Sequence, residues 1–317
     1  MTRPRLPTWG VGVAASVVLV VGVAAVTAAS TPQVEAAVAS PRKAVREPLP
    51  QPPPPPPMPV PVVPVDVGSQ ALGPPPGPED DVRPGRVAAP KDRYAFLAGV
   101  TDYRPPTVDT IGSANDVRFL RDQLLASGWR AENIRMITDR EVTGDALRAG
   151  MDWLVEQGRP GTFTHFHWSG HVKQLGGGTE ALWPVDRDWV RDRDLTASLR
   201  RVQGRMWVDI AGCEGGSFLP GLPSDRILVS ASSRDVEKSY EFPDWGMSVW
   251  TGLVHDLGIR QRGADADRDG RVTIGETLRY SAYYAQRITW NQHPYGRQTP
   301  QVEGDPVRGW TLADPPA

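Results

Sequence analysis

The chain has 317 residues, of which 33 are proline and only one is cysteine. A single cysteine excludes an intramolecular disulfide and any metal site built from several thiolates. With 35 basic and 37 acidic residues, the net charge of −2 gives no electrostatic reason to expect nucleic-acid binding. Eighteen of the prolines fall within residues 41–90, and the remaining C-terminal part, about 220 residues, is long enough for one sizeable core.

Residues 1–31 are predicted to be a membrane anchor or a signal peptide. Residues 9–29 carry no charge and have nearly the length needed to cross a bilayer. A secretory signal core is usually shorter, which favours an uncleaved anchor, although Ala37-Val38-Ala39 could serve as a cleavage site. We therefore expect a membrane-anchored or secreted protein with its C-terminal part on the extracytoplasmic side.

Residues 32–90 are predicted to be a disordered linker. Residues 52–57 are six consecutive prolines, and such a stretch lacks backbone donors and prefers extended polyproline II. We interpret the tract as a semi-rigid spacer; docking of proline-binding domains is the alternative.

Strand and helix patterns alternate from Tyr94 onward. Apolar runs predict strands, and apolar residues at helical spacing, closed by glycines, predict helices. The predicted strands are residues 94–100, 134–138, 162–168, 205–210 and 226–230; the predicted helices are residues 115–127, 144–157 after a Thr143 cap, and 247–257. This alternation predicts an α/β fold with a largely parallel sheet covered on both faces.

Two reactive side chains follow directly after neighbouring predicted strands. His171 ends the sequence Trp-Ser-Gly-His after the third strand, and Cys213 follows the fourth strand in a glycine-rich loop. Ligands of such sheets bind beyond the carboxyl ends of the strands. A lone cysteine is ordinarily a small buried hydrophobe, but a core cysteine belongs inside a strand. His165 and His167 do lie inside the strand and are predicted to be packing or tautomer-fixed residues.

These blocks resemble the caspase-like cysteine peptidases, in particular metacaspases and bacterial orthocaspases. The resemblance covers residues 94–312 and rests on ordered blocks at residues 96–103, 113–117, 168–171, 182–186, 213–216, 230–233 and 297–300. It implies that residues 91–313 form a caspase-like (caspase–haemoglobinase) three-layer sandwich with a mostly parallel central sheet. It also implies protein or peptide substrates.

The chemistry of a cysteine peptidase fits the two residues. A free cysteine is mostly protonated at neutral pH, so a neighbouring imidazole has to hold or remove the thiol proton. The resemblance implies that Cys213 is the nucleophile and His171 the base. The backbone amides of Cys213 and Val172 would then stabilise the oxyanion.

The resemblance also indicates residues that bind substrate, with two departures from the family pattern. Asp116, Ser169 and Val172 occupy positions that line the substrate site of the family. Metacaspases usually carry an aspartate two residues before the cysteine and a glycine after the histidine; here these are Ala211 and Val172. We expect a preference for Arg or Lys at P1, although one pocket carboxylate is missing and the nearest upstream aspartate is Asp209.

Residues 265–276 fit the twelve-residue EF-hand calcium loop at every key position. Four carboxylates on one loop would repel one another without a cation, so we expect a bound Ca²⁺. Residues 258–263 leave little room for a full entering helix, which predicts a half EF-hand. The predicted ligands are Asp265, Asp267, Asp269, Arg271 through its carbonyl, Thr273 and Glu276.

Two further functions are compatible with the same sequence. Val172 and Ala211 favour a catalytically inactive, calcium-stabilised binding or scaffold module, whereas the retention of both Cys213 and His171 argues against it. A transpeptidase or other acyl transferase would use the same two residues.

Overall fold

The computed structural model describes residues 92–290, 296–304 and 310–312. The predicted N-terminal segment and the proline-rich linker lie outside these residues. Of the helices within them, none combines the length and the apolar composition that are needed to cross a membrane.

A six-stranded sheet with the order β11-β8-β7-β3-β1-β2 lies at the centre of the described part. Its parallel strands are β1 (Arg93–Gly99), β2 (Ile134–Thr138), β3 (Phe163–Ser169), β7 (Arg205–Ala211) and β8 (Ile227–Ala231). Strand β11 (Gln301–Glu303) pairs antiparallel with β8 at the edge. All five predicted strands are confirmed to within one residue at each end, because each is an apolar run bounded by turn residues.

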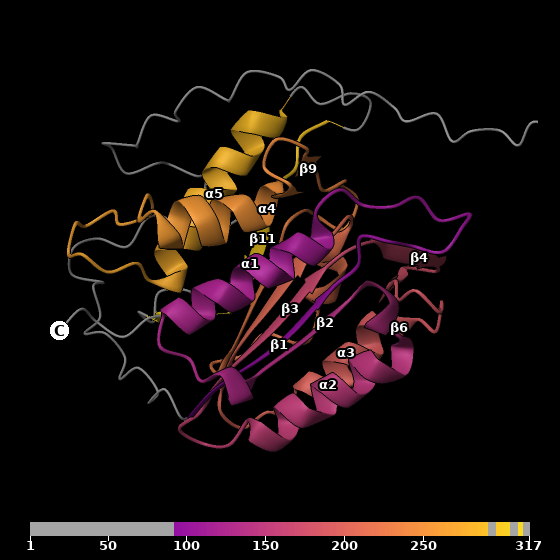
Figure 1. Cartoon of the computed structure of the whole chain (residues 1–317), viewed down its shortest axis with the longest axis horizontal. Helices are drawn as coiled ribbons and strands as arrows, with labels where there is room; N and C mark the ends of the chain where they lie inside the picture. The colour runs from indigo at the N-terminus through magenta and orange to yellow at the C-terminus, as the bar shows by residue number, and fades with distance from the viewer. Residues whose placement is uncertain (1–91, 291–295, 305–309, 313–317) are drawn as a thin grey trace, which may run out of the picture. The chain divides into compact units, whose positions relative to one another are not determined.

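Helices cover both faces of this sheet, as predicted (Figure 1). Side chains alternate along the strands: Phe96 and Phe166 belong to one apolar cluster, and Leu97 and Trp207 belong to the other. Helices α2 (Gly144–Gln157) and α3 (Asp192–Leu199) cover the first face; α1 (Ser113–Ala126), α4 (Val249–Thr251) with η5 (Gly252–Arg260), and α5 (Ile274–Thr289) cover the second.

The starts of two helices show what a local pattern can and cannot predict. Thr143 caps α2 by accepting the amide of Ala146 at 3.1 Å, as its position indicated. Helix α1 instead begins at a carboxylate from far along the chain. Glu241 accepts the amides of Ile111 and Gly112 at 2.6 and 3.0 Å, a contact that no local pattern indicates.

Short elements that the sequence patterns did not predict surround the carboxyl edge of the sheet. A small antiparallel sheet consists of β4 (Val172–Gly176), β5 (Thr179–Leu182) and β6 (Val190–Arg191), and β9 (Glu241–Phe242) pairs with β10 (Met247–Ser248). Single helical turns at this edge are η3 (Asp139–Glu141) and η4 (Gly215–Phe218), whereas η2 (Ala131–Asn133) lies at the opposite edge, directly before β2. They are too short to show a period in the sequence.

The helix before the predicted calcium loop is longer than expected. We predicted little room for an entering helix after Gly258, and this is wrong, because α4 and η5 run without a break to Arg260. A Cβ added at Gly258 would overlap the hydroxyl of Thr277 in α5. The glycine therefore permits close packing of η5 against α5 and does not end the helix.

Candidate active site

The loops that carry His171 and Cys213 lie against each other at the carboxyl edge of the sheet. Strands β3 and β7 are paired with Ser169 opposite Ala211, and the amide of Gly170 donates to the carbonyl of Ala211 at 3.1 Å. A Cβ on Gly212 would lie 2.8 Å from the carbonyl oxygen of Gly170. The two loops can approach so closely because residue 212 has no side chain.

The ring of His171 is held by an aromatic side chain and by a backbone carbonyl. The ring centroids of Tyr103 and His171 are 4.7 Å apart, and the hydroxyl of Tyr103 accepts the His171 amide at 2.9 Å. The ring nitrogen Nε2 lies 2.7 Å from the carbonyl oxygen of Val108. Because a carbonyl can only accept, Nε2 carries the hydrogen and Nδ1 is left with a free lone pair. The neutral ring is thus in the tautomer of a base.

The thiol of Cys213 contacts the backbone of Ser239. Sγ lies 3.4 Å from the amide nitrogen and 3.8 Å from the carbonyl oxygen of Ser239. Burial, opposed in part by the Ser239 amide, raises the pKa of the Cys213 thiol. Within the described residues, no hydrogen bond joins Sγ to the imidazole of His171. The thiol is therefore protonated at neutral pH and directed toward Ser239.

A segment comprising residues 237–240 is held over this thiol, and we call it the covering segment. The carbonyl of Glu237 accepts the amide of Glu214, and its carboxylate accepts the amide of Thr299, at 2.8 and 2.7 Å. Lys238 pairs with the carboxylate of Glu214, which has a left-handed backbone with a φ of 52°. The segment thus connects the cysteine loop with the residues directly before β11.

The three predicted substrate-binding residues are all buried beneath the site. The Ser169 hydroxyl donates to Asp116 at 2.6 Å, and the amide of Ser248 donates to the other carboxylate oxygen at 3.0 Å. Burial, opposed by these hydrogen bonds, raises the pKa of Asp116 to about 6. Val172 is also buried and begins β4.

Asp209, the nearest aspartate upstream of Cys213, lies elsewhere. Residues alternate between the two faces of a strand, so Asp209 in β7 lies on the face covered by α4 and η5. It contacts His167 there at 2.9 Å and the indole nitrogen of Trp250 at 2.7 Å. Asp209 therefore does not replace the carboxylate that is missing at Ala211.

Three groups at the site were not predicted from the sequence as contacts: Tyr103, the Val108 carbonyl and the Ser239 backbone. Tyr103 ends the first of the resembling blocks, so that block could have indicated it. A backbone carbonyl or amide is present whatever the residue type, so the amino-acid sequence does not indicate which of them makes a contact. Only the fold reveals the roles of Val108 and Ser239.

The predicted calcium ligands come together in the structure. Carboxylate oxygens of Asp265, Asp267 and Asp269 lie within 4.8 Å of one another, and Gly270 makes the turn with a φ of +84°. Burial together with the two neighbouring aspartates raises the pKa of Asp265, and its Oδ1 is buried with no hydrogen-bond partner among the described residues. The loop thus concentrates negative charge around a carboxylate oxygen that is free to bind a cation.

The remaining predicted ligands frame the same loop. Both oxygens of Glu276 face inward, where Oε1 accepts the amide of Ala266 and Oε2 accepts the amide of Thr273. The amide of Arg271 donates to Asp269 at 2.6 Å, which folds the chain around the cluster. Asp186 lies outside this loop; its carboxylate accepts the amide of Gly144 at 3.2 Å at the start of α2.

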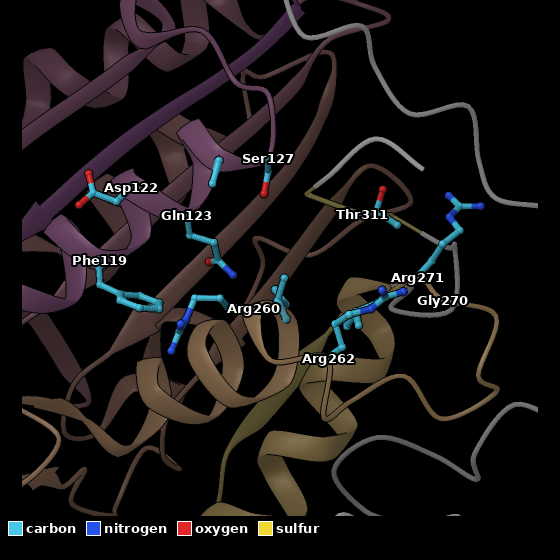
Figure 2. Close-up of a pocket in the computed structure, with 12 residues that line it drawn as sticks. Phe119, Asp122, Gln123, Ser127, Arg260, Arg262, Gly270, Arg271 and Thr311 are labelled. Carbon is cyan, nitrogen blue, oxygen red and sulfur yellow. The ribbon is translucent and has the colours of Figure 1, made fainter. Parts of the chain in front are cut away.

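A cavity of about 490 Å³ lies between α1, η5 and the loop of residues 265–276 (Figure 2). Phe119 and Gln123 of α1 line one side, Arg260 of η5 lines the other, and Gly270 and Arg271 of the calcium loop close one end. No residue of the cysteine or histidine loops lines it. The cavity is therefore separate from the candidate active site.

Comparison with known proteins finds metacaspases. No family model matches the chain. Metacaspase-1 of Mycosarcoma maydis is 28% identical over 147 residues, 40% of this chain and 36% of that protein. Metacaspase-3 of Arabidopsis thaliana is 28% identical over 173 residues, 48% and 46% of the two chains. Metacaspase-1 of Candida albicans is 33% identical over 94 residues, 28% and 20% of the two chains. The matches span less than half of each relative.

Among solved structures, a crystal structure of a Geobacter sulfurreducens protein is similar to the chain. It has a TM-score of 0.49 and 13% sequence identity, and the match covers 71% of this chain and 98% of that one.

Proposed function

Because this chain is a member of the metacaspase-type, caspase-like family of cysteine peptidases, we propose that it is a cysteine endopeptidase with Cys213 as nucleophile and His171 as general base. One observation carries the proposal: the two side chains leave paired strands at adjacent positions, with Ser169 opposite Ala211. The Val108 carbonyl fixes the tautomer that leaves Nδ1 free.

The proposed reaction begins with transfer of the Sγ proton to Nδ1 of His171. The thiolate attacks the carbonyl carbon of the scissile bond, and the amides of Cys213 and Val172 donate to the oxyanion. The imidazolium returns its proton to the leaving amine, and water then hydrolyses the thioester with His171 again as base. The thiol has to leave Ser239 before the first of these steps.

The proposed P1 residue is arginine or lysine. The carboxylates of Glu214 and Glu241 act electrostatically on Cys213, where both oppose formation of the thiolate. Asp116 adds a third carboxylate beneath the site. A cationic P1 side chain would complement this negative surrounding.

In a peptide series that varies only P1, we expect Asp116→Asn to lower the preference for Arg over Gln about tenfold. One charge interaction at about 10 Å and an effective dielectric of 20 is worth on the order of 1–2 kcal/mol. The carboxyl group has a pKa of about 6, so it is neutral below that pH. The preference of the wild type should therefore fade below about pH 6. Asp152→Asn, an exposed change on α2, is the control; an unchanged Arg preference in Asp116→Asn would refute this role.

We also propose that the loop of residues 265–276 binds one Ca²⁺. The clustered carboxylates, the free oxygen of Asp265 and the inward-facing Glu276 support this proposal. The residues proposed to hold the ion are Asp265, Asp267, Asp269, Arg271, Thr273 and Glu276. Calcium would hold the start of α5 against the end of η5 and so stabilise this side of the sheet.

We expect Ca²⁺ at 100 times its Kd to stabilise the protein by about 2.7 kcal/mol, which raises Tm by roughly 5–10 °C. Glu276→Gln should abolish most of this shift. Glutamine at this position can still cap α5, so the variant should fold. Asp152→Asn removes the same charge from α2 and should keep the full shift. An equal calcium shift in Glu276→Gln would exclude this loop as the site.

The alternative function, an inactive binding module, is favoured by the contact between the Cys213 thiol and Ser239. Labelling by a thiol-directed peptide inhibitor decides between the two functions. A peptidase is labelled at Cys213 in competition with substrate, whereas an inactive module is labelled only as fast as an ordinary buried thiol.

We further propose that the N-terminal segment exports the peptidase or tethers it to a membrane, on the extracytoplasmic side, with the proline tract as spacer. This proposal rests on the apolar residues 9–29 and the prolines of residues 41–90. Fractionation of cells that express the full chain, with protease added from outside, tests it.

A further inference from the structure

Three buried histidines meet on the face of the sheet opposite α2. His165 and His167 lie two residues apart in β3, so both project to the same side, and His255 comes from the middle of η5. All three side chains are 0% exposed. Their ring centroids are 5.7–6.1 Å apart, and a nitrogen from each ring lies within 4.8 Å of the other two.

The hydrogen bonds of the two strand histidines fix their tautomers. Nδ1 of His165 lies 3.1 Å from the carbonyl oxygen of Trp207, and Nδ1 of His167 lies 2.9 Å from Oδ2 of Asp209. A carbonyl and a carboxylate only accept, so both Nδ1 atoms carry the hydrogen. Each Nε2 is therefore an unprotonated lone pair, and neither has a hydrogen-bond partner among the described residues.

The third histidine, His255, has fewer hydrogen bonds through its ring than the other two. Neither Nδ1 nor Nε2 of His255 has a hydrogen-bond partner within the described part of the chain. Burial lowers the pKa of His255 and lowers that of His165 to about 3, so these two rings are neutral. Buried polar atoms are nearly always paired, and a cluster with four unpaired ring nitrogens calls for a partner.

Asp209 completes the cluster as an oriented anion. Its Oδ1 accepts the hydroxyl of Ser230 at 2.6 Å and the indole of Trp250 at 2.7 Å, which turns Oδ2 toward the histidines. Burial opposes its ionisation, but the hydrogen bond from His167 and the nearby imidazole of His255, whose Nε2 lies 3.5 Å from Oδ2, keep its pKa below the ordinary value. Its only ion-pair partners among the described residues are these two imidazoles.

We propose that His165, His167 and His255 bind one transition-metal ion through imidazole nitrogens, with Zn²⁺ as the best match and Asp209 as the hydrogen-bonding partner of His167. Neutral imidazole is a preferred ligand of zinc and its neighbours in the first transition row. A carboxylate behind a ligating histidine is the usual outer partner, since it fixes the tautomer and raises the basicity of the ring. The cation would lie close to the Asp209 carboxylate, which contacts both His167 and His255.

The proposed ion has a structural role rather than a catalytic one. The three nitrogens would be drawn together by Zn–N bonds of about 2.0–2.1 Å. The ion would then join β3 to η5, and η5 leads directly into the proposed calcium loop. Element η5 is π-helical over Gly252–Arg260, which includes His255, and the His255 carbonyl accepts the side-chain amide of Gln123 at 2.7 Å. Such irregular turns occur frequently at functional sites.

The test measures metal in the full-length chain carrying Cys213→Ala, so that no thiolate contributes. After incubation with Zn²⁺ and removal of free metal, we expect about one zinc per chain. His255→Gln or His167→Gln in this background should remove it. Asp209→Asn should weaken zinc binding about 10–100-fold. His171→Gln, which removes a histidine outside the cluster, and Glu276→Gln, in the calcium loop, should retain the zinc.

The proposal is overturned if the parent chain binds no zinc. It is also overturned if both His255→Gln and His167→Gln retain the zinc. If these variants fail to fold, the ligands of Co²⁺ bound to the parent chain are identified instead by X-ray absorption spectroscopy. A cobalt coordination sphere that contains three imidazoles supports the site. A coordination sphere of oxygen ligands, or one with a single imidazole, overturns it.

Discussion

Cys213→Ala should lower kcat/KM for peptide hydrolysis by at least about 10⁴-fold, because loss of the nucleophile removes the covalent route entirely. Stability should change by less than about 1 kcal/mol, since the thiol is only partly buried and its contacts are to the Ser239 backbone. Initial rates on a peptide with a basic P1 residue, and thermal unfolding of the same preparations, give the two numbers.

Cys213→Ser is the matched control. The hydroxyl preserves the size of the side chain and its polar contact with Ser239, but it is a much weaker nucleophile in this setting. Activity lost in both variants, with the fold intact, supports the nucleophile. Activity kept in Cys213→Ala would mean that another residue performs the hydrolysis. A wild type that is folded but cleaves no peptide and reacts with no peptide-directed inhibitor would instead identify the inactive module.

His171→Gln should lower turnover by about 10²–10⁴-fold and yet leave the reaction of Cys213 with iodoacetamide almost unchanged. The reason is the resting state of the thiol. Burial raises the pKa of Cys213, and within the described residues its contacts are to Ser239 and not to the imidazole. In the proposed mechanism His171 therefore acts as a base during the reaction, a contribution of that size, and does not keep a preformed thiolate.

The pH dependence of this alkylation separates the two mechanisms. With a raised pKa, the thiolate fraction is small at neutral pH and continues to grow up to and beyond the ordinary pKa of cysteine. The alkylation rate should therefore rise through pH 9 without a plateau, in the wild type and in His171→Gln alike. A plateau at neutral pH that disappears in His171→Gln would show a thiolate–imidazolium pair and contradict the proposed resting state.

The covering segment explains how a buried thiol can belong to a peptidase. Tyr240 donates its amide to the side chain of Gln298 at 2.9 Å, and Glu237 accepts the amide of Thr299. These contacts tie residues 237–240 to the chain that follows α5. A substrate that pairs with this segment would draw Ser239 away from Sγ, so binding and activation of the thiol would be coupled.

Much of the fold could be predicted because its signals are local. An apolar run such as residues 94–100 has to be buried, and the Thr143 side chain can accept a helix amide three residues away. The acidic loop of residues 265–276 is a local signal of the same kind, since the proposed calcium ligands lie within twelve consecutive residues. The positions of His171 and Cys213 after strands followed from the rule that parallel strands end at a common edge.

Other features depended on contacts between distant residues. Gly258 looked like the end of a helix, yet it permits close packing of η5 against α5. Asp209 is the nearest aspartate upstream of Cys213 in the sequence, but its place in β7 directs it to the opposite side of the sheet from α2 and into contact with His167. One residue type can occur in several structural roles, and the residues packed around it in the fold determine which role it has.

The sequence by itself determined the order of the elements, the two reactive side chains and the twelve-residue acidic loop, because each depends on residues close together along the chain. Only the tertiary structure decided that the Cys213 thiol rests on Ser239, that the Val108 carbonyl orients His171, and that His255 lies beside two strand histidines predicted as packing or tautomer-fixed residues. These contacts join segments far apart in the chain, and the parallel sheet, through its register and the packing of its helices, brings them together.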